Sequence, residues 1–284
     1  MQTVSAEEIS RAVRAALGED LGSGDATTLA TIPPDETSRA EMVAREDLTL
    51  AGISFAEETF RQLSPDIRFA RKHSDSDLVT KGEVILEISG KTAPILSAER
   101  VALNFVQRLS GVASLTATFV KAIAGTGAVI LDTRKTTPGW RTFEKYAVSC
   151  GGGKNHRIGL FDLILIKDNH LAALRDQKPN AVAAAVRLSR QKYPNLKVEV
   201  EADTLDQVEQ ALDAKADIIL LDNMTCNLMR EAVKLTAGRA KLEASGGVNL
   251  ETVRAIAETG VDYISVGALT HSARAVDIAL DFKA

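Results

Sequence analysis

The sequence predicts an α/β protein in which a small N-terminal α/β domain precedes an incomplete parallel α/β barrel of the TIM type. The first observation is that short apolar runs alternate with helical runs after Ala124, as they do in βα units. The second is that each run ends in charged residues or glycine, as strands do at the active-site face of a barrel. Six runs stand out, fewer than the eight of a closed barrel. An open doubly wound sheet is the alternative.

The elements of the barrel region follow from these runs. The predicted strands are 129–131, 163–166, 198–200, 218–221, 242–244 and 263–266. The predicted helices are 141–150, 180–192, 205–214, 227–237 and 250–259. A further short strand is expected near residues 155–157, and His271 is expected to open a final helix.

Upstream of the barrel, the pattern indicates a small α/β domain. Ser5 and Glu8 have capping-box spacing and predict a helix to about residue 17. Residues 19–25 contain Gly-Ser-Gly and are interpreted as a linker, because no apolar strand precedes them. Alternating runs at 38–50 and 67–88 predict strands on either side of a helix at 54–63.

Residues 76–90 resemble the hairpin of a lipoyl or biotinyl carrier, with Lys81 beside Gly82 at the turn. A carrier presents its lysine at a tight turn, and no methionine flanks this one. An ordinary small α/β domain is therefore the preferred interpretation over a carrier module.

The composition restricts the classes of function. The 284 residues are 45% hydrophobic and 25% charged, as in an ordinary soluble protein. The formal charge of −4 and the 4% aromatic content argue against a nucleic-acid partner. No apolar run approaches the roughly 20 residues that span a bilayer. The acidic, amphipathic N-terminus is unlike a secretory signal, and Cys150 and Cys226 lack metal or disulfide spacing, so we expect a cytoplasmic protein.

One stretch has the opposite charge to the chain as a whole. Between Arg134 and Lys167 there are seven lysines or arginines and two acids, a local excess of five positive charges. Such an excess predicts a small, highly anionic ligand. A solvated helix face is the alternative and suits Lys145, which lies within the predicted helix 141–150. It does not suit Arg134, Lys135 or Lys167, which directly follow apolar strands.

Further polar groups collect at the ends of the later strands. Glu201 and Asp222 end neighbouring strands, where paired carboxylates hold a divalent cation, bind sugar hydroxyls or stabilise a developing carbocation. Glu199 points the same way as Glu201 if the strand is regular. Ser-Gly-Gly at Ser245 and Val-Gly-Ala at Val266 each precede a helix and predict a phosphate site, with a tight βα turn as the alternative.

A long helix is predicted from Ser97 to about Ala124, with a kink or interruption at Gly111. Arg100 lies near its expected start, where a positive charge is unfavourable to the helix dipole. Either a surface ion pair or a ligand carboxylate accounts for this arginine, and its residue type alone leaves both open.

Several motifs together resemble the quinolinate phosphoribosyltransferase family. The stretches are EDLGSGDATT, AREDLTLAG, AERVALNFVQRLSG, LDTRKTTPG, EKYAVSCGGGKNHRIGLFDLILIKDNH, VEVEADTLDQ, LLDNM, EASGGVNLETVRAIAETGVDYISVGALTHS and DIALDF. DTRKTTPG, GGGKNHR and KDNH are the most specific. A molybdenum-transport paralogue looks similar but lacks the KDNH segment, which stands here at Lys167–His170.

The resemblance implies an N-terminal α/β sandwich domain at residues 1–110 and a barrel domain at 111–284, whose C-terminal tail folds back on the first domain. It implies transfer of phosphoribosyl from phosphoribosyl pyrophosphate to quinolinate, with decarboxylation to nicotinate mononucleotide in NAD synthesis. Mg²⁺ is the implied cofactor. A homodimer or hexamer is implied, in which one subunit's first domain caps the partner's site and contributes Arg100.

The same resemblance assigns roles to single residues. Quinolinate would be held by Arg100, Thr133, Arg134, His156, Arg157 and Lys167. Phosphoribosyl pyrophosphate would be held by Lys135, Glu201, Asp222, Ser245, Gly246, Gly247, Val266, Gly267, Ala268 and His271. The catalytic residues would be Lys135, Lys167, Glu201 and Asp222, and the last two would hold the metal, directly or through water or substrate.

Other functions stay open at this point. A Schiff-base lyase would use Lys135 or Lys167 as its nucleophile. A sister transferase would act on nicotinate, although the number of cations favours a dicarboxylate. A catalytically inactive metabolite sensor is a further alternative, against which the intact charged set argues.

Overall fold

The computed structural model describes residues 3–283, which form two compact units. One unit comprises residues 3–117, 142–152 and 272–283, and the other comprises residues 118–141 and 153–271. The boundary expected at residue 110 falls within a single continuous helix. Among residues 3–283, none of the helices combines the length and the apolar composition needed to span a bilayer.

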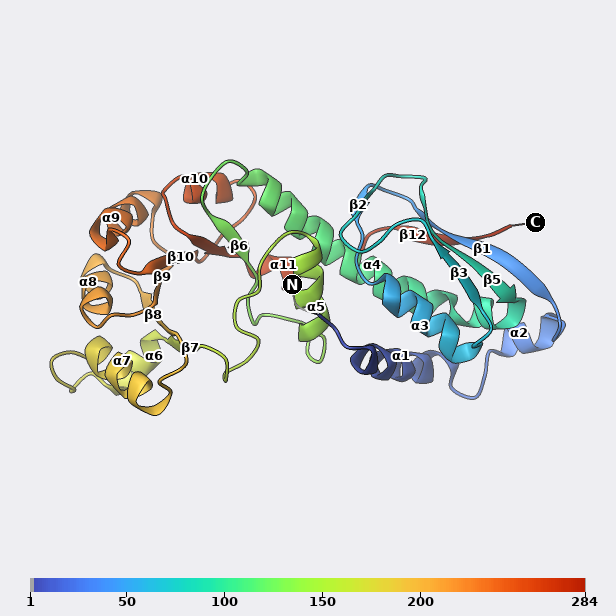
Figure 1. Cartoon of the computed structure of the whole chain (residues 1–284), viewed down its shortest axis with the longest axis horizontal. Helices are drawn as coiled ribbons and strands as arrows, with labels where there is room; N and C mark the ends of the chain where they lie inside the picture. The colour runs from blue at the N-terminus through green and yellow to red at the C-terminus, as the bar shows by residue number, and fades with distance from the viewer. Residues whose placement is uncertain (1–2, 284) are drawn as a thin grey trace. The chain divides into compact units, whose positions relative to one another are not determined.

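The first unit is an antiparallel sheet covered by helices (Figure 1). Its four-stranded sheet has the order β12-β1-β5-β3, and β2 pairs with β4. The strands are β1 (Thr37–Ala44), β2 (Leu48–Thr49), β3 (Arg68–Arg71), β4 (Leu78–Val79), β5 (Val84–Lys91) and β12 (Ile278–Lys283). The helices are α1 (Ala6–Leu21), α2 (Ala26–Thr31), α3 (Ile53–Leu63), α4 (Thr92–Ala122) and α5 (Arg141–Cys150). Its core includes Met42, Phe60, Ile88, Leu103 and Ile278, which come from three strands, α3 and α4.

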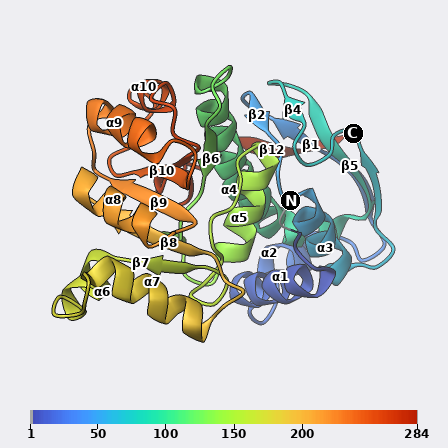
Figure 2. The ribbon, with the colours of Figure 1, turned by 60° about the vertical axis from the view of Figure 1, so that its left-hand side comes forward.

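The second unit is a fan of six parallel strands (Figure 2). Their order is β6-β11-β10-β9-β8-β7, so β6 and β7 are edges and the barrel is incomplete. The strands are β6 (Val129–Leu131), β7 (Ile164–Ile166), β8 (Val198–Ala202), β9 (Ile218–Asp222), β10 (Lys241–Ser245) and β11 (Tyr263–Ser265). The helices are α6 (Asp168–Ala173), α7 (Ala181–Lys192), α8 (Leu205–Asp213), α9 (Cys226–Thr236), α10 (Val253–Ala257) and α11 (Ala268–His271).

All six predicted barrel strands are present, which confirms the interpretation of the apolar runs. The additional strand expected at residues 155–157 is wrong, because that segment is a loop attached to β6 by one bridge between Leu131 and Lys154. The final helix expected at His271 is also wrong. His271 ends α11, and the chain continues into β12, which pairs antiparallel with β1.

The interpretation of residues 19–25 as a linker is wrong in part. α1 begins at the predicted capping box of Ser5 and Glu8 but extends to Leu21. α2 begins directly after Asp25, whose carboxylate accepts the Thr28 N–H at 3.0 Å. The turn between the helices is therefore short, because the Asp25 side chain satisfies the exposed donors of the second helix.

Helix α4 corrects two expectations about the long helical segment. It begins at Thr92, so Arg100 lies two turns inside the helix and is far from the dipole's positive end. It also continues without interruption through Gly111. A Cβ atom at Gly111 would lie 1.9 Å from the Arg274 carbonyl oxygen, so the glycine permits close packing of the C-terminal segment and introduces no kink.

Helix α5 spans its predicted residues, but the prediction that Lys145 lies on a solvent-exposed face of this helix is wrong. Lys145 is fully buried and does not belong to a solvated basic face. Its neighbour Glu144 is equally buried and accepts a hydrogen bond from Arg108 of α4 at 2.7 Å. The helix therefore packs polar side chains into the first unit, where charges require partners.

Candidate active site

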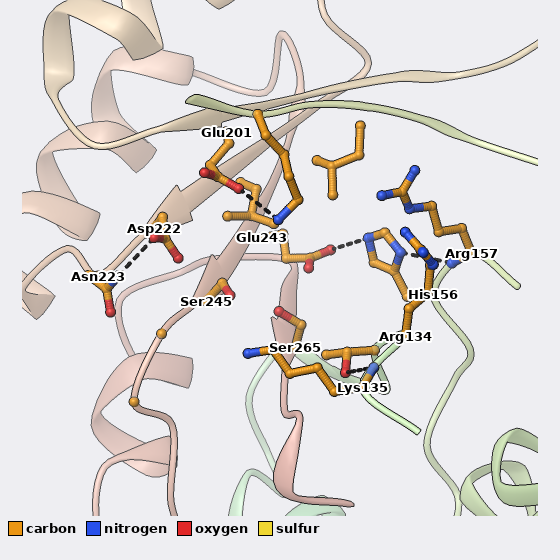
Figure 3. Close-up of a pocket in the computed structure, with 16 residues that line it drawn as sticks. Arg134, Lys135, His156, Arg157, Glu201, Asp222, Asn223, Glu243, Ser245 and Ser265 are labelled. Carbon is orange, nitrogen blue, oxygen red and sulfur yellow. Dashed lines mark hydrogen bonds and ion pairs between the residues drawn. The ribbon is translucent and has the colours of Figure 1, made fainter. Parts of the chain in front are cut away.

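A cavity of about 640 Å³ lies in the second unit, at the carboxyl ends of its parallel strands (Figure 3). Every residue around it comes from the second unit. The lining residues are Thr133, Arg134, Lys135, His156, Arg157, Leu165, Lys167, Glu201, Leu220, Asp222, Asn223, Glu243, Ser245, Gly246, Gly247 and Ser265. This is the place where parallel α/β folds bind ligands.

The loop after β6 supplies a cationic end of the cavity. Arg134 and Arg157 both line it, and the Arg134 Nε is buried without a hydrogen-bond partner among the described residues. Burial, and then the neighbouring Arg134, lowers the pKa of Arg157, which remains a cation because guanidinium does not deprotonate in proteins. Two crowded guanidinium groups therefore favour a bound anion.

A buried carboxylate holds this loop in place. Asp132 is fully buried and accepts the His156 N–H at 2.8 Å and the Asn155 amide at 2.6 Å. Further along, Asp162 accepts the N–H groups of Ile158 and Gly159. Asp132 and Asp162 therefore fix the conformation of the loop at residues 155–159 through hydrogen bonds. This explains why the segment is ordered without forming a strand.

His156 lies between two glutamates from the middle of strands. Its Nε2 is 2.9 Å from Glu199 on β8 and 3.4 Å from Glu243 on β10, and both acids are buried. Burial disfavours the charged ring, but the two carboxylates close to Nε2 outweigh it and raise the pKa of His156 to about 10. The Arg157 N–H faces Nδ1 at 2.8 Å, which suits a neutral ring. The ring therefore presents its Nε2 to the two carboxylates, whose negative charge favours protonation of the ring.

The same three side chains have ligand atoms within 4.8 Å of one another, a spacing that also suits a metal ion. The ring Nε2 is close enough to both glutamates for ion pairs. The four oxygens of Glu199 and Glu243 are nevertheless buried without a hydrogen-bond partner of good geometry among the described residues.

Carboxylates occupy the middle of the cavity. Glu201 lies one residue before the end of β8 and pairs with the Lys167 Nζ at 3.4 Å, and Asp222 ends the neighbouring strand β9 (Figure 3). Burial, and then Asp203, raises the pKa of Asp222. Two carboxylates at adjacent strand ends form a donor set that a hard cation such as Mg²⁺ prefers.

Glycine turns form the end of the cavity opposite the loop cations. Gly246 and Gly247 have φ of +96° and +61°, the left-handed region that other residues rarely adopt. A Cβ atom on Gly267 would lie 3.1 Å from the His271 Nε2 and 3.2 Å from the Lys135 Cδ. Backbone N–H groups are accessible at such turns, which suits a phosphate. The helix that follows this turn, predicted at 250–259, is α10 and begins at Val253.

The structure brings together most of the predicted residues. Those that line the cavity are Thr133, Arg134, Lys135, His156, Arg157, Lys167, Glu201, Asp222, Ser245, Gly246 and Gly247. Val266, Gly267, Ala268 and His271 lie outside the lining set, although Gly267 and His271 lie close to Lys135. Arg100 belongs to the first unit and is exposed on α4.

Five lining residues were missing from the predicted set, namely Leu165, Leu220, Asn223, Glu243 and Ser265. Glu243 could have been predicted from the sequence, because an acid in the middle of a buried parallel strand requires a partner. Ser265 is a small polar residue at the end of β11, and nothing in the sequence distinguishes it from other serines.

Models of one family match both parts of the chain. The model described as "Quinolinate phosphoribosyl transferase, N-terminal domain" matches residues 25–110, and that of the C-terminal domain matches residues 112–281. The chain belongs to the quinolinate phosphoribosyltransferase family. The match of the C-terminal model includes every residue that lines the cavity.

Relatives of this family resemble the chain over nearly its whole length. The chloroplastic nicotinate-nucleotide pyrophosphorylase (carboxylating) of Arabidopsis thaliana is 43% identical over 96% of this chain and 82% of the relative. A quinolinate phosphoribosyltransferase (decarboxylating) of Nicotiana glauca is 45% identical over 94% of this chain and 80% of the relative. The solved nicotinate-nucleotide pyrophosphorylase of Francisella tularensis is 42% identical, with a TM-score of 0.93 over 99% of this chain and 98% of that one.

Proposed function

We propose that this member of the family transfers phosphoribosyl from phosphoribosyl pyrophosphate to quinolinate. The products are nicotinate mononucleotide, pyrophosphate and carbon dioxide, and the reaction belongs to NAD biosynthesis. One observation carries this proposal within the family: a single cavity has a cationic end, a pair of carboxylates and a glycine-turn end. These three parts suit a dicarboxylate, a ribose and a phosphate.

The cationic end suits quinolinate. Arg134 and Arg157 have the planar fork that binds a carboxylate through two hydrogen bonds. His156 adds a charge that its two glutamates maintain, and Lys167 and Thr133 lie beside it in the cavity wall. Nicotinate has one carboxylate and would leave part of this charge unpaired, which favours quinolinate as the substrate.

The opposite end suits the phosphoribosyl donor. The turn Ser245–Gly247 presents backbone donors to the 5-phosphate. In the later turn after β11, Gly267 and His271 lie close to Lys135, and together with Val266 and Ala268 they would bind the same phosphate. Lys135 contacts the donor's anionic groups. Glu201 and Asp222 bind the ribose hydroxyls, directly or through Mg²⁺, which when bound neutralises the charge of the pyrophosphate leaving group.

The chemistry then requires few special groups. The bond between the anomeric carbon and the pyrophosphate oxygen breaks and leaves a ribose with positive charge, which the Glu201 and Asp222 carboxylates stabilise. The pyridine nitrogen forms the new bond with its own electron pair. The ring nitrogen becomes cationic, so the bond from C2 to its carboxylate breaks, carbon dioxide leaves, and C2 takes up a proton.

The assembly is also part of this proposal. We infer a homodimer or hexamer in which Arg100, exposed on α4, reaches the quinolinate end of a partner's cavity. A cytoplasmic location is the expectation for this chain, although the Arabidopsis thaliana relative is chloroplastic.

The test is an assay with purified protein, phosphoribosyl pyrophosphate and Mg²⁺, in which quinolinate and nicotinate are offered separately. The proposal predicts nicotinate mononucleotide and trapped carbon dioxide from quinolinate alone. Product from nicotinate, or from neither compound, would contradict it. Borohydride treatment in the same assay tests the Schiff-base alternative, and a trapped adduct on Lys135 or Lys167 would support that lyase instead.

A further inference from the structure

Asn223 occupies an unusual position between two parts of the cavity. It directly follows Asp222 at the end of β9, lines the cavity, and has a φ of +54°. Asparagine is one of the few residues that tolerate this left-handed conformation. Its N–H donates to the Ser245 carbonyl oxygen at 2.9 Å, which joins the end of β9 to the end of β10.

The side chain of Asn223 contacts both of its neighbours. Its Nδ2 donates to the Asp222 Oδ2 at 2.8 Å (Figure 3). Its Oδ1 lies 2.1 Å from the position that a Cβ atom on Gly246 would occupy, so the amide packs directly against that glycine. One amide therefore spans the gap between the carboxylate and the glycine turn.

We propose that Asn223 is a positioning residue that holds the Asp222 carboxylate and the Ser245–Gly247 turn at a fixed separation, matched to the ribose and the phosphate of one phosphoribosyl donor. This inference rests on the proposed function and adds a residue to it. The two groups of the donor are joined covalently, so a shift of either protein part misplaces the anomeric carbon. Displacements of about 1 Å in such sites cost on the order of 100-fold in rate.

The residue type follows from this role. The amide is a donor and an acceptor in one group, so it can bind Asp222 and still pack its oxygen against the turn. Aspartate has the same shape but cannot donate, and its charge would repel Asp222. Glycine adopts the same φ but lacks the amide, so it separates the side chain's effect from that of the backbone.

The experiment compares Asn223→Asp and Asn223→Gly with the wild-type enzyme, with KM measured separately for phosphoribosyl pyrophosphate and quinolinate. For Asn223→Asp, kcat/KM for phosphoribosyl pyrophosphate should fall about 100-fold, because a charged hydrogen bond is replaced by repulsion. For Asn223→Gly the loss should be about tenfold. The KM for quinolinate should change less than about threefold in either variant, since the ring end is untouched.

Two controls isolate the effect. Lys215 also has a positive φ, +60°, and is not among the lining residues, so Lys215→Gly reports the effect of a glycine at such a position. Asn227 is exposed on α9, so Asn227→Asp reports an added charge nearby in sequence. Both should behave as the wild-type enzyme does.

A second measurement tests the contact itself. Gly246→Ala should lose more activity in the wild-type background than in Asn223→Gly, because the Cβ clash with Oδ1 is then absent. Equal losses in both backgrounds, or a parallel rise of both KM values in the Asn223 variants, would overturn the inference. Wild-type protein that makes no nicotinate mononucleotide would instead overturn the proposed function.

Discussion

The two ends of the cavity are built from different materials. At the loop end, Arg134, His156 and Arg157 present cationic or ionisable side chains, and buried acids hold His156 in place. At the other end, the Ser245–Gly247 turn presents mainly backbone, and its glycines adopt left-handed φ values. A charged end depends on counter-charges and pH, whereas a backbone end depends on the absence of side chains.

This difference predicts two kinds of failure. A variant at the charged end should lose affinity or rate through lost charge, and a conservative replacement of similar charge should recover part of it. A variant at the turn should lose affinity for the phosphate when a single uncharged methyl group is added, because the loss there is steric. The following variants test that contrast.

Lys167→Ala should have the largest effect. It removes a cation that pairs with Glu201 between the ring end and the carboxylates, and turnover should fall by about 10²–10³-fold. Circular dichroism and melting should be unchanged, because the side chain is half exposed. Lys197→Ala is the control, since Lys197 is exposed and precedes β8 at the strand end away from the cavity. Near-wild-type turnover in Lys167→Ala would contradict the assignment of this lysine to the active site.

Gly246→Ala tests the backbone end. Its φ of +96° and the 2.1 Å approach of the Asn223 Oδ1 leave no room for a methyl group. The KM for phosphoribosyl pyrophosphate should rise by about 10- to 100-fold, which steady-state kinetics measures. The matched control is Gly238→Ala, where φ is also positive, +77°, but no atom lies within 4 Å of the added methyl. If both variants bind the donor equally poorly, general backbone strain explains the result.

Glu243→Gln tests the buried counter-charges through pH. Losing one of two carboxylates should lower the pKa of His156 from its value of about 10. The KM for quinolinate should then begin to rise at lower pH than in the wild-type enzyme. Because the folded pKa is raised, the ring's contribution to stability is complete below about 6.5 and is lost as pH rises through about 10. The variant's loss of stability should therefore be larger at pH 6 than at pH 10, and overlapping pH profiles would refute the role of Glu243.

Glu46→Gln should have the smallest effect and lies outside the cavity. Hydrogen bonds from Arg274, opposed in part by burial, lower the pKa of Glu46 to about 2. With a lowered pKa, the contribution to stability is present above about 4.5 and is lost as pH falls through about 2. At pH 7 the melting temperature should drop by about 1–3 °C with kcat unchanged, because such exposed pairs contribute little. A change in kcat would mean that charges outside the cavity also set its properties.

The sequence predicted the parallel sheet well for a physical reason. Strands such as β6 and β9 are short apolar runs that end at a charged residue, so pattern and burial coincide there. It failed where distant residues decide the local structure. The loop at 155–157 is shaped by the buried Asp132, and Lys145 is buried by tertiary packing that no helical period reveals.

The site shows the same division. Residues at strand ends, such as Lys167 and Glu201, were predicted because position alone marks them. Glu243 was missed because it lies in the middle of a strand, and its role depends on His156 from a separate loop. Asn223 also lies at a strand end but was not assigned to the site, because its importance lies in a φ value and a contact with Gly246.

The most direct test of the two-ended cavity is a crossed measurement of KM for quinolinate and for phosphoribosyl pyrophosphate in Arg157→Ala and Gly246→Ala. Arg157→Ala should raise the KM for quinolinate at least about tenfold and leave that for phosphoribosyl pyrophosphate nearly unchanged. Gly246→Ala should do the reverse. If each variant raised both KM values together, the two ends would not recognise different parts of the substrates, and the account would be wrong.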